Sequence, residues 1–425
     1  MPSEAPSHAF VWVWLPGAAD PVVAGRLDAR GDLLDFTYGR SYLARDDAIP
    51  LYLPELPLVR GRIEPLPELY VPGCIADAAP DAWGQRLIMN RLLGAGSDST
   101  DPATLSLLTY LLESGSDRTG AIDFQRSPGE YVRRGDGGAP LELLAESVEL
   151  VERGEPLPRE LEQALLHGSS IGGARPKATI DDGGRRLIAK FSSTADRFPV
   201  VKAEFVAMEL ARRCGLDVAS VELTSANGKD ALLVERFDRE PGAATRRPLV
   251  SALTILELHE MLARYASYAD LAEQIRRRFT EPRQTLRELF GRIVFNVLVG
   301  NTDDHARNHA AFWDGSREML TLAPAYDICP QARGGGEASQ AMIIRPDGFR
   351  MSQVSGCVEG AATYMLSQAD AREMVDHQIE TIESQWADVC DLAALTRAER
   401  HLFWRRQFLN RYALEGHEGA TAVTS

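Results

Sequence analysis

A short polar segment that follows a run of apolar residues constrains this chain more than any other feature. Residues 299–309 read VGNTDDHARNH, and they place Asp303 and Asn308 five positions apart. A second isolated aspartate, Asp327, follows after sequence typical of a β-hairpin. A carboxylate can accept the proton of a hydroxyl group, and Mg²⁺ prefers carboxylate and carbonyl oxygens as ligands. We therefore expect the fold to be arranged around this segment and Asp327.

The order of these three side chains is the order found in phosphate-transferring enzymes. In protein kinases an aspartate accepts the substrate proton, an asparagine five positions later binds a metal ion, and a later aspartate holds Mg²⁺ against the phosphates. This pattern predicts Asp303 as the catalytic base, and Asn308 and Asp327 as metal ligands. The chain is thus interpreted as a phosphotransferase.

The same segment admits other interpretations of its neighbouring residues. His305 and His309 lie four positions apart, a spacing that on a helix could bind Zn²⁺ in a metallohydrolase. Ala306 stands where that motif has a glutamate, so two structural histidines are favoured over zinc ligands. Asp304 is either an assistant to Asp303 or a surface acid.

A glycine-rich loop and a hairpin precede this segment by more than a hundred residues. Residues 167–177 read HGSSIGGARPK, and their glycines allow backbone N–H groups to face an anion, although a plain turn is the alternative. The predicted phosphate contacts in this loop are Ser170, Ile171, Gly172 and Gly173. Segments 177–180 and 186–191 flank a Gly-Gly turn, as in a hairpin. The second strand ends in Lys190, as does the kinase strand whose lysine holds the α- and β-phosphates.

A helix and a second hairpin complete this region. Apolar spacing predicts a helix over residues 200–213, with Glu204 in its first turns. Glu204 either pairs with Lys190, as in a kinase, or is a solvated acid beside Lys202. Residues 218–224 and 231–237 flank Asn-Gly, a strong turn signal. Residues Glu235 to Phe237 would then be the hinge that offers backbone groups to adenine, which completes the order of a kinase small lobe.

The rest of the chain supports an α+β fold. Residues 9–50 are rich in strand and turn signals, residues 141–166 are largely helical with an interruption at 154–158, and helices are expected over 251–266, 269–278 and 285–299. The apolar residues of the last helix are expected on one side. We predict a small β-rich N-terminal subdomain and a two-lobed kinase-like core with a mostly helical larger lobe. The predicted regions are residues 1–140, 141–240 and 241–425.

Composition limits the possible partners and location. The 46 basic and 61 acidic residues give a net charge of −15, which opposes attraction of the whole surface to nucleic acid or to an anionic membrane. The five cysteines are scattered and never form a C-x-x-C pair, so neither a disulfide framework nor a zinc knuckle is expected. The apolar run at residues 9–15 is too short for a membrane helix. A cytoplasmic protein fits these observations.

Several motifs together resemble one known family, the HipA-like serine/threonine kinases, which are the toxins of bacterial toxin–antitoxin pairs. The resemblance covers most of the chain, and the matching segments are GSDRTGA at 115–121, SSIGGARPK at 169–177, LVERFDR at 233–239, GNTDDHARN at 300–308 and PAYDI at 324–328. It implies ATP and Mg²⁺ as cofactors and the same roles for Lys190, Asp303, Asn308 and Asp327. It also implies autophosphorylation of a loop serine matching Ser170, with Ser169 as the alternative.

The resemblance carries expectations about partners as well. It implies a small DNA-binding antitoxin of the HipB type, through which an acidic chain would associate with DNA only indirectly. It suggests a protein substrate, of which an aminoacyl-tRNA synthetase is one candidate. The alternative from another functional class is a non-catalytic co-repressor that keeps a nucleotide pocket only to hold its partner.

Overall fold

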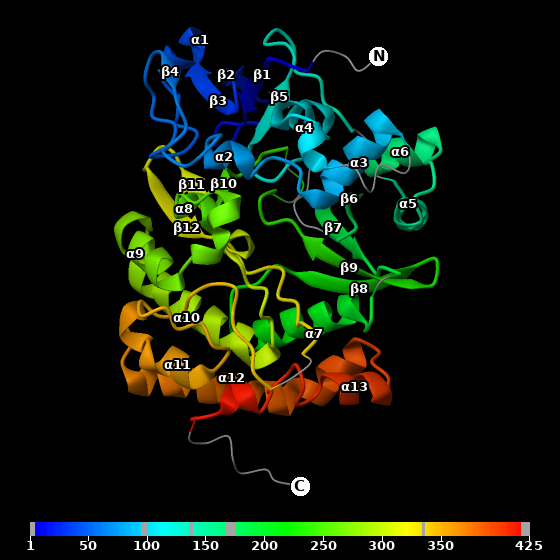
Figure 1. Cartoon of the computed structure of the whole chain (residues 1–425), viewed down its shortest axis with the longest axis vertical. Coiled ribbons are helices and arrows are strands. Elements are labelled where there is room, and N and C mark those ends of the chain that lie inside the picture. Colours follow the sequence, from blue (N-terminus) through cyan, green and yellow to red (C-terminus); the bar gives the residue numbers. More distant parts are fainter. Residues whose placement is uncertain are drawn as a thin grey trace. The chain divides into compact units, whose positions relative to one another are not determined.

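The computed structural model describes residues 5–94, 101–135, 139–166, 175–194, 196–240, 242, 244–333 and 336–417 (Figure 1). The chain folds into two compact units. Unit 1 comprises residues 1–195, 224–250 and 312–318, and unit 2 comprises residues 196–223, 251–311 and 319–425. The predicted mixture of a β-rich N-terminal part with a mostly helical C-terminal part is confirmed.

The N-terminal part of unit 1 is an antiparallel sheet with the strand order β4-β3-β2-β1-β5. Its strands are β1 (His8–Val13), β2 (Val22–Arg30), β3 (Leu33–Tyr38), β4 (Arg62–Ile63) and β5 (Ile122–Gln125). Aromatic and β-branched residues line these strands, as strand propensity requires. Strand β5 pairs with β1 from Val13 opposite Ile122 to Phe10 opposite Gln125. This pairing fixes the end of the 115–121 loop, which enters β5 directly.

A second sheet in unit 1 has the strand order β6-β7-β9-β8. Its strands are β6 (Lys177–Asp182), β7 (Arg185–Phe191), β8 (Val221–Ala226), within which the chain enters unit 1, and β9 (Lys229–Glu235). Both predicted hairpins are confirmed. Asn227 and Gly228 have φ values of 50° and 78°, which suits a two-residue turn that matches the strand twist.

Unit 1 also contains helices, three of which pack against this second sheet. The helices are α1 (Arg40–Leu43), α2 (Gly73–Ala76), α3 (Ala82–Leu93), the 3-10 helix η2 (Pro102–Thr104), α4 (Leu107–Glu113), α5 (Leu141–Glu152) and α6 (Arg159–Leu166). One apolar core joins α3, α5 and α6 to the strands, and Trp83, Leu144 and Phe191 are among its members. The Trp83 indole also donates a hydrogen bond to the Lys177 carbonyl, at 3.1 Å.

Unit 2 is almost entirely helical. Its helices are α7 (Val200–Arg213), α8 (Ala252–Ile255), η3 (Glu260–Tyr265), α9 (Tyr268–Arg278), α10 (Pro282–Val299), η4 (Ala306–Asn308), α11 (Val354–Glu359), η5 (Ala361–Tyr364), α12 (Gln368–Leu392), α13 (Arg397–Phe403) and η6 (Tyr412–Leu414). Strands β10 (Leu249–Ser251), β11 (Ala310–Asp314) and β12 (Met319–Leu322) lie where the chain passes between the units. No helix in the described part of the chain is long and apolar enough to cross a bilayer.

Helix α10 is the centre of unit 2. It contacts α9, α11 and α12, and Figure 1 shows the long helix α12 running below α7 and α10. The apolar residues that were expected on one side of α10 are buried, and so is every other residue from Leu289 to Val299. A helix that is surrounded in this way must satisfy its polar side chains internally. Buried Arg292 does so by contacting Glu288 at 2.7 Å and the carbonyls of Ala323 and Asp217 at 3.0 and 3.1 Å.

The expectation of a single helix over residues 251–266 was wrong. Ser251 caps α8 by accepting a hydrogen bond from the Thr254 backbone, but α8 ends after one turn. Glu257 has a φ of 57°, a left-handed conformation that cannot continue a right-handed helix. Part of the remaining segment forms the separate 3-10 helix η3.

Candidate catalytic and metal-binding site

Helix α10 delivers the central polar segment through a sharp turn at Gly300. Gly300 caps the helix in the left-handed region, with φ 70° and ψ 26°. A Cβ atom at this position would lie 2.8 Å from the Gln407 carbonyl oxygen, closer than real Cβ contacts come. Glycine is therefore required twice here, for its backbone angles and for its lack of a side chain.

Asp304 is the buried anchor of the segment. Its side chain is 3% exposed and accepts hydrogen bonds from the Tyr268 hydroxyl, from Asn296 Nδ2 at 2.7 Å and from His309 Nε2 at 3.0 Å. A carboxylate can only accept hydrogen bonds. The proton of the His309 ring that faces Asp304 is therefore on Nε2. The alternative that Asp304 is a surface acid was wrong. His309 thereby joins Asp304 to the end of the segment.

Asp303, the neighbouring residue, is exposed to solvent instead. Partial burial of its carboxyl group raises the pKa of Asp303 above the usual aspartate value. The nearby charges of Asp327 and Asp304 raise this pKa further, and His305 acts in the opposite direction. Neighbouring carboxylates that repel each other create a negative potential, and this potential favours binding of a cation.

Asn308 and Asp327 both lie near Asp303. Asn308 ends the short helix η4, and its amide nitrogen donates to the Asp303 carbonyl at 3.3 Å. Its amide oxygen is then the atom that would bind a metal ion. The Tyr326 hydroxyl donates to the Arg307 carbonyl at 2.6 Å, which ties the segment before Asp327 to η4. Asp327 itself has a φ of 60°, a conformation that aspartate adopts more readily than most residues.

This donor set fits Mg²⁺ bound together with phosphate. Within the described residues, no group of three or more His, Cys, Asp and Glu side chains could hold a metal ion by itself. Mg²⁺ is usually held by one or two carboxylates and completes its shell with phosphate and water oxygens. One amide oxygen from Asn308 and one carboxylate from Asp327 match that requirement.

The predicted nucleotide-binding residues of unit 1 lie on the second sheet. Lys190 lies near the end of β7, directly opposite Lys177 of β6, and is buried. Glu235 is the last residue of β9, and the ring of Phe237 packs edge-to-face on Phe312 at 5.9 Å. The Arg236 N–H donates to the Arg186 carbonyl at 2.8 Å. Since backbone groups alternate along an antiparallel strand, those of Glu235 face the opposite edge, and Phe237 lies in the turn that follows β9.

The structure describes the remaining predicted site residues only in part. Glu204 is buried in α7 with 3% exposure, so the alternative of a solvated acid was wrong. Lys190 lies in unit 1 and Glu204 in unit 2, and their pairing stays a prediction. The loop residues Ser169, Ser170, Ile171, Gly172 and Gly173 lie outside the described residues.

Sequence reasoning missed the side chains that support the site. Asn296 also accepts a hydrogen bond from Asn301 Nδ2 at 2.9 Å, so it joins Asp304 to the start of the segment. A polar asparagine in the apolar sequence of α10 was a signal that could have identified it. Tyr268 carried no such signal, because its contact with Asp304 spans 36 positions.

Comparison with known proteins identifies a matching family and several relatives. The family described as the HipA-like C-terminal domain matches residues 169–386, slightly more than half of the chain. The candidate kinase Y4mE of Sinorhizobium fredii is 29% identical over 326 residues, which cover 71% of this chain and 73% of that protein. The serine/threonine-protein kinase toxin HipA of Shewanella oneidensis is 27% identical over 186 residues, which cover 37% of this chain and 42% of that protein.

A solved structure shows the same fold. HipA of Shewanella oneidensis MR-1, in a complex with HipB and its operator DNA, matches with a TM-score of 0.66 and 19% identity. The match covers 95% of this chain and 99% of that one. At this identity, the likeness describes the fold alone.

Proposed function

The chain belongs to the HipA-like C-terminal domain family, and on that premise we propose that it is an ATP-dependent kinase that phosphorylates serine or threonine. The observation that carries the proposal is the meeting of Asp303, Asn308 and Asp327 within unit 2. A scaffold protein would not need a complete set of groups for phosphate transfer.

Each of these residues has a distinct role in the proposed reaction. Asp303 accepts the proton of the attacking hydroxyl. Asn308 and Asp327 would hold Mg²⁺, which supplies positive charge next to the phosphate oxygens. Lys190 would contact the α- and β-phosphates, with Glu204 orienting it, and the backbone of residues 235–237 would receive the adenine.

Binding of ATP is expected to depend on Mg²⁺ and on the charge of Asp327. Asp327→Asn keeps the size of the side chain but removes its charge, so Mg²⁺-ATP should bind on the order of tenfold more weakly, a loss of about 1.4 kcal/mol. Isothermal titration with and without Mg²⁺ measures this change. The matched control is Asp347→Asn, at an exposed aspartate of unit 2 that is paired with Arg345. Equal affinities of the parent and Asp327→Asn would contradict the metal assignment.

We also propose that the kinase acts as a growth-inhibiting toxin with a HipB-like antitoxin as its partner. Support comes from the solved HipA structure, which is a complex with HipB and operator DNA. The net charge of −15 opposes contact of the whole surface with DNA phosphates, so an adaptor is the expected route to any association with DNA. The substrate would be a cytoplasmic protein, for which the family resemblance suggests an aminoacyl-tRNA synthetase. A co-repressor without kinase activity is the outcome if no transfer is detected.

Ser170 is proposed as an internal off-switch. Phosphorylation would add about −1.5 to −2 charges to a glycine-rich loop that is predicted to bind ATP phosphates. The modified protein should therefore bind ATP more weakly than the unmodified one. Mass spectrometry after incubation with ATP locates the phosphate, and titration of the separated forms measures the affinity. Phosphate on Ser169 alone would reassign the site, and equal affinity of the two forms would remove the switch.

A further inference from the structure

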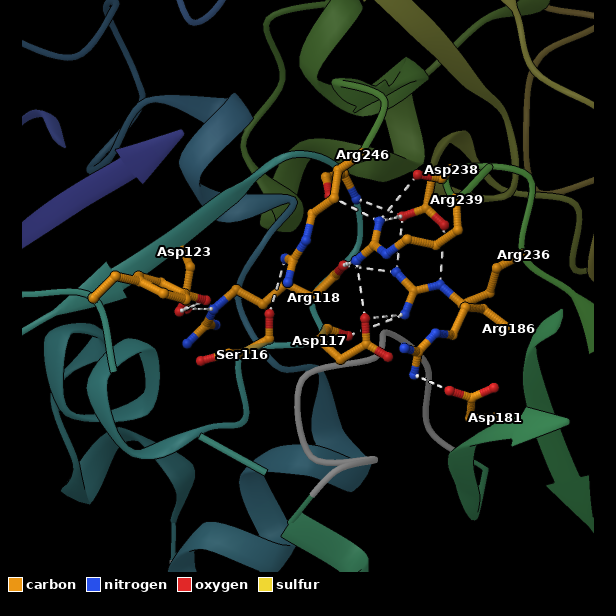
Figure 2. A network of polar contacts seen from close by, with 12 residues as sticks. Ser116, Asp117, Arg118, Asp123, Asp181, Arg186, Arg236, Asp238, Arg239 and Arg246 are labelled. Carbon is orange, nitrogen blue, oxygen red and sulfur yellow. Dashed lines mark hydrogen bonds and ion pairs between the residues drawn. The ribbon is translucent and has the colours of Figure 1, made fainter. Parts of the chain in front are cut away.

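A buried network of charges joins two sequence motifs of unit 1 that lie far apart along the chain. Figure 2 shows that the network connects the 115–121 loop to the hinge segment, which we define as residues 235–239. Both motifs contain an arginine and an aspartate that are almost completely buried. Burying charged side chains costs free energy unless they are paired with opposite charges. A buried network of this kind therefore calls for a structural or functional explanation.

Arg236 is held on several sides. Its guanidinium forms a two-pronged contact with Asp238, at 2.9 and 2.8 Å. It also contacts Asp117 Oδ1 at 2.9 Å and donates to the Arg118 carbonyl at 2.7 Å. The planar fork of arginine fits such a set of acceptors in only one orientation. The side chain next to Phe237 is therefore fixed to the 115–121 loop.

The other side of Phe237 is fixed in the same way. Asp238 accepts a hydrogen bond from the Gly120 backbone at 2.7 Å, and Arg239 donates to the Gly120 carbonyl at 3.0 Å. Arg239 also contacts Asp117 Oδ1 at 3.0 Å, so one carboxylate oxygen serves both Arg236 and Arg239. Asp117 is thus the point at which the two arginines of the hinge segment meet.

Asp117 is a permanent negative charge in this network. Burial alone would raise the pKa of its carboxyl group, but the charges of Arg236, Arg239 and Arg246 outweigh burial and hold the pKa far below the usual range. Arg246 stacks on the Trp14 ring at 3.5 Å and donates to the Ser116 carbonyl at 2.9 Å. Without Asp117, these positive charges would lose a counter-charge that lies in contact with two of them.

The 115–121 loop is itself anchored, so it can act as a fixed support. Arg118 pairs with Asp123 of β5 at 2.7 Å and donates to the Ala78 carbonyl at 3.0 Å. The Ser116 N–H donates to the Arg134 carbonyl at 3.0 Å. The Arg118–Asp123 pair ties the loop to the five-stranded sheet, and Figure 2 shows Asp123 on the side of the loop away from Arg236.

We propose that Asp117 is a positioning residue for adenine binding, because through Arg236 and Arg239 it fixes the backbone of the hinge segment. This inference rests on the proposed kinase function and extends it, since it gives the N-terminal 115–121 loop a part in nucleotide selection. Preorganised binding segments lose less entropy when a ligand binds, so a loosened hinge segment weakens binding of the adenine ring. The phosphate contacts, which lie elsewhere, are unaffected.

The test compares Asp117→Asn with the parent in the full chain. The variant should bind ATP about tenfold more weakly, whereas its affinity for Mg²⁺-tripolyphosphate, which has no adenine, should change less than twofold. Hydrogen exchange at the amides of residues 235–239 should become faster. The matched control is Asp35→Asn, which removes another buried aspartate of unit 1 that pairs with two arginines, Arg30 and Arg62. It should change neither the ratio of the two affinities nor the exchange.

Each outcome decides the inference. Equal losses for ATP and tripolyphosphate, or faster exchange of residues 235–239 in both variants, would mean that Asp117 is only structural. If Asp117→Asn does not fold, Arg239→Gln takes its place, because it removes the guanidinium contacts of Arg239 with Asp117 and with the Gly120 carbonyl but leaves the Arg236–Asp238 pair intact. If the parent binds no ATP, the proposed function fails, and the exchange rates still decide whether Asp117 fixes the hinge segment.

Discussion

Replacement of Asp303 by asparagine is expected to slow phosphate transfer by a factor on the order of 10²–10⁴, because an amide cannot accept the proton of the attacking hydroxyl. Asparagine has the same shape as aspartate, and the Asn308 hydrogen bond goes to the backbone of residue 303 rather than to its side chain. The loop should therefore keep its structure. Binding of ATP should remain measurable, because Asp303 is not a predicted ATP or metal ligand.

The rate is measured as phosphate incorporated into the protein per unit time at saturating ATP. The matched control is Asp270→Asn on α9, an exposed aspartate of the same unit, which should leave the rate unchanged. If Asp303→Asn transfers phosphate as fast as the parent, Asp303 is not the catalytic base. If ATP binding is lost together with transfer, the variant has disturbed the site as a whole.

Replacement of Asp304 by alanine is expected to lower the free energy of unfolding by about 4 kcal/mol. The change leaves buried donors on Tyr268, Asn296 and His309 without their acceptor, and each such donor costs about 1–3 kcal/mol. The three costs overlap because the donors share one cavity. Chemical denaturation of the full chain, followed by circular dichroism, measures the loss.

The control for this prediction is the adjacent residue. Asp303→Ala removes an exposed carboxylate whose pKa is raised by burial and by neighbouring negative charges. Its removal should change the free energy of unfolding by less than about 1 kcal/mol, and relief of the repulsion makes a small gain possible. Similar stability of the two variants would show that Asp304 is not the anchor of the segment. Comparison of the two variants thus distinguishes the aspartate that stabilises the segment, Asp304, from the aspartate that is proposed to act in catalysis, Asp303.

Local patterns predicted the parts of the fold that depend on nearby residues. The helix over 200–213 and both hairpins of the small lobe follow from apolar spacing and from Gly-Gly and Asn-Gly turns, and the structure confirms them. The structure also links Asn308 to the backbone of Asp303 through a hydrogen bond, while the catalytic and metal-binding roles of the two residues stay predictions.

Features that depend on distant contacts were not predictable in this way. The sequence of α10 shows apolar spacing but not that the helix is covered on all sides. The partners of Asp304 and Asp117 come from elements separated by up to 36 and 122 positions, and no local pattern records such pairings. The pairing of Lys190 with Glu204 stays a prediction, because the two residues lie in different units.

The central claim is that this chain transfers the γ-phosphate of ATP, and the most direct test is to incubate the parent protein with γ-labelled ATP and Mg²⁺. Label is expected on a serine or threonine of the chain, with Ser170 as the first candidate. It should disappear when Mg²⁺ is removed, and the Asp303→Asn variant should lose it almost completely. Absence of label from a parent protein that binds Mg²⁺-ATP, or equal labelling of the parent and Asp303→Asn, would contradict the claim.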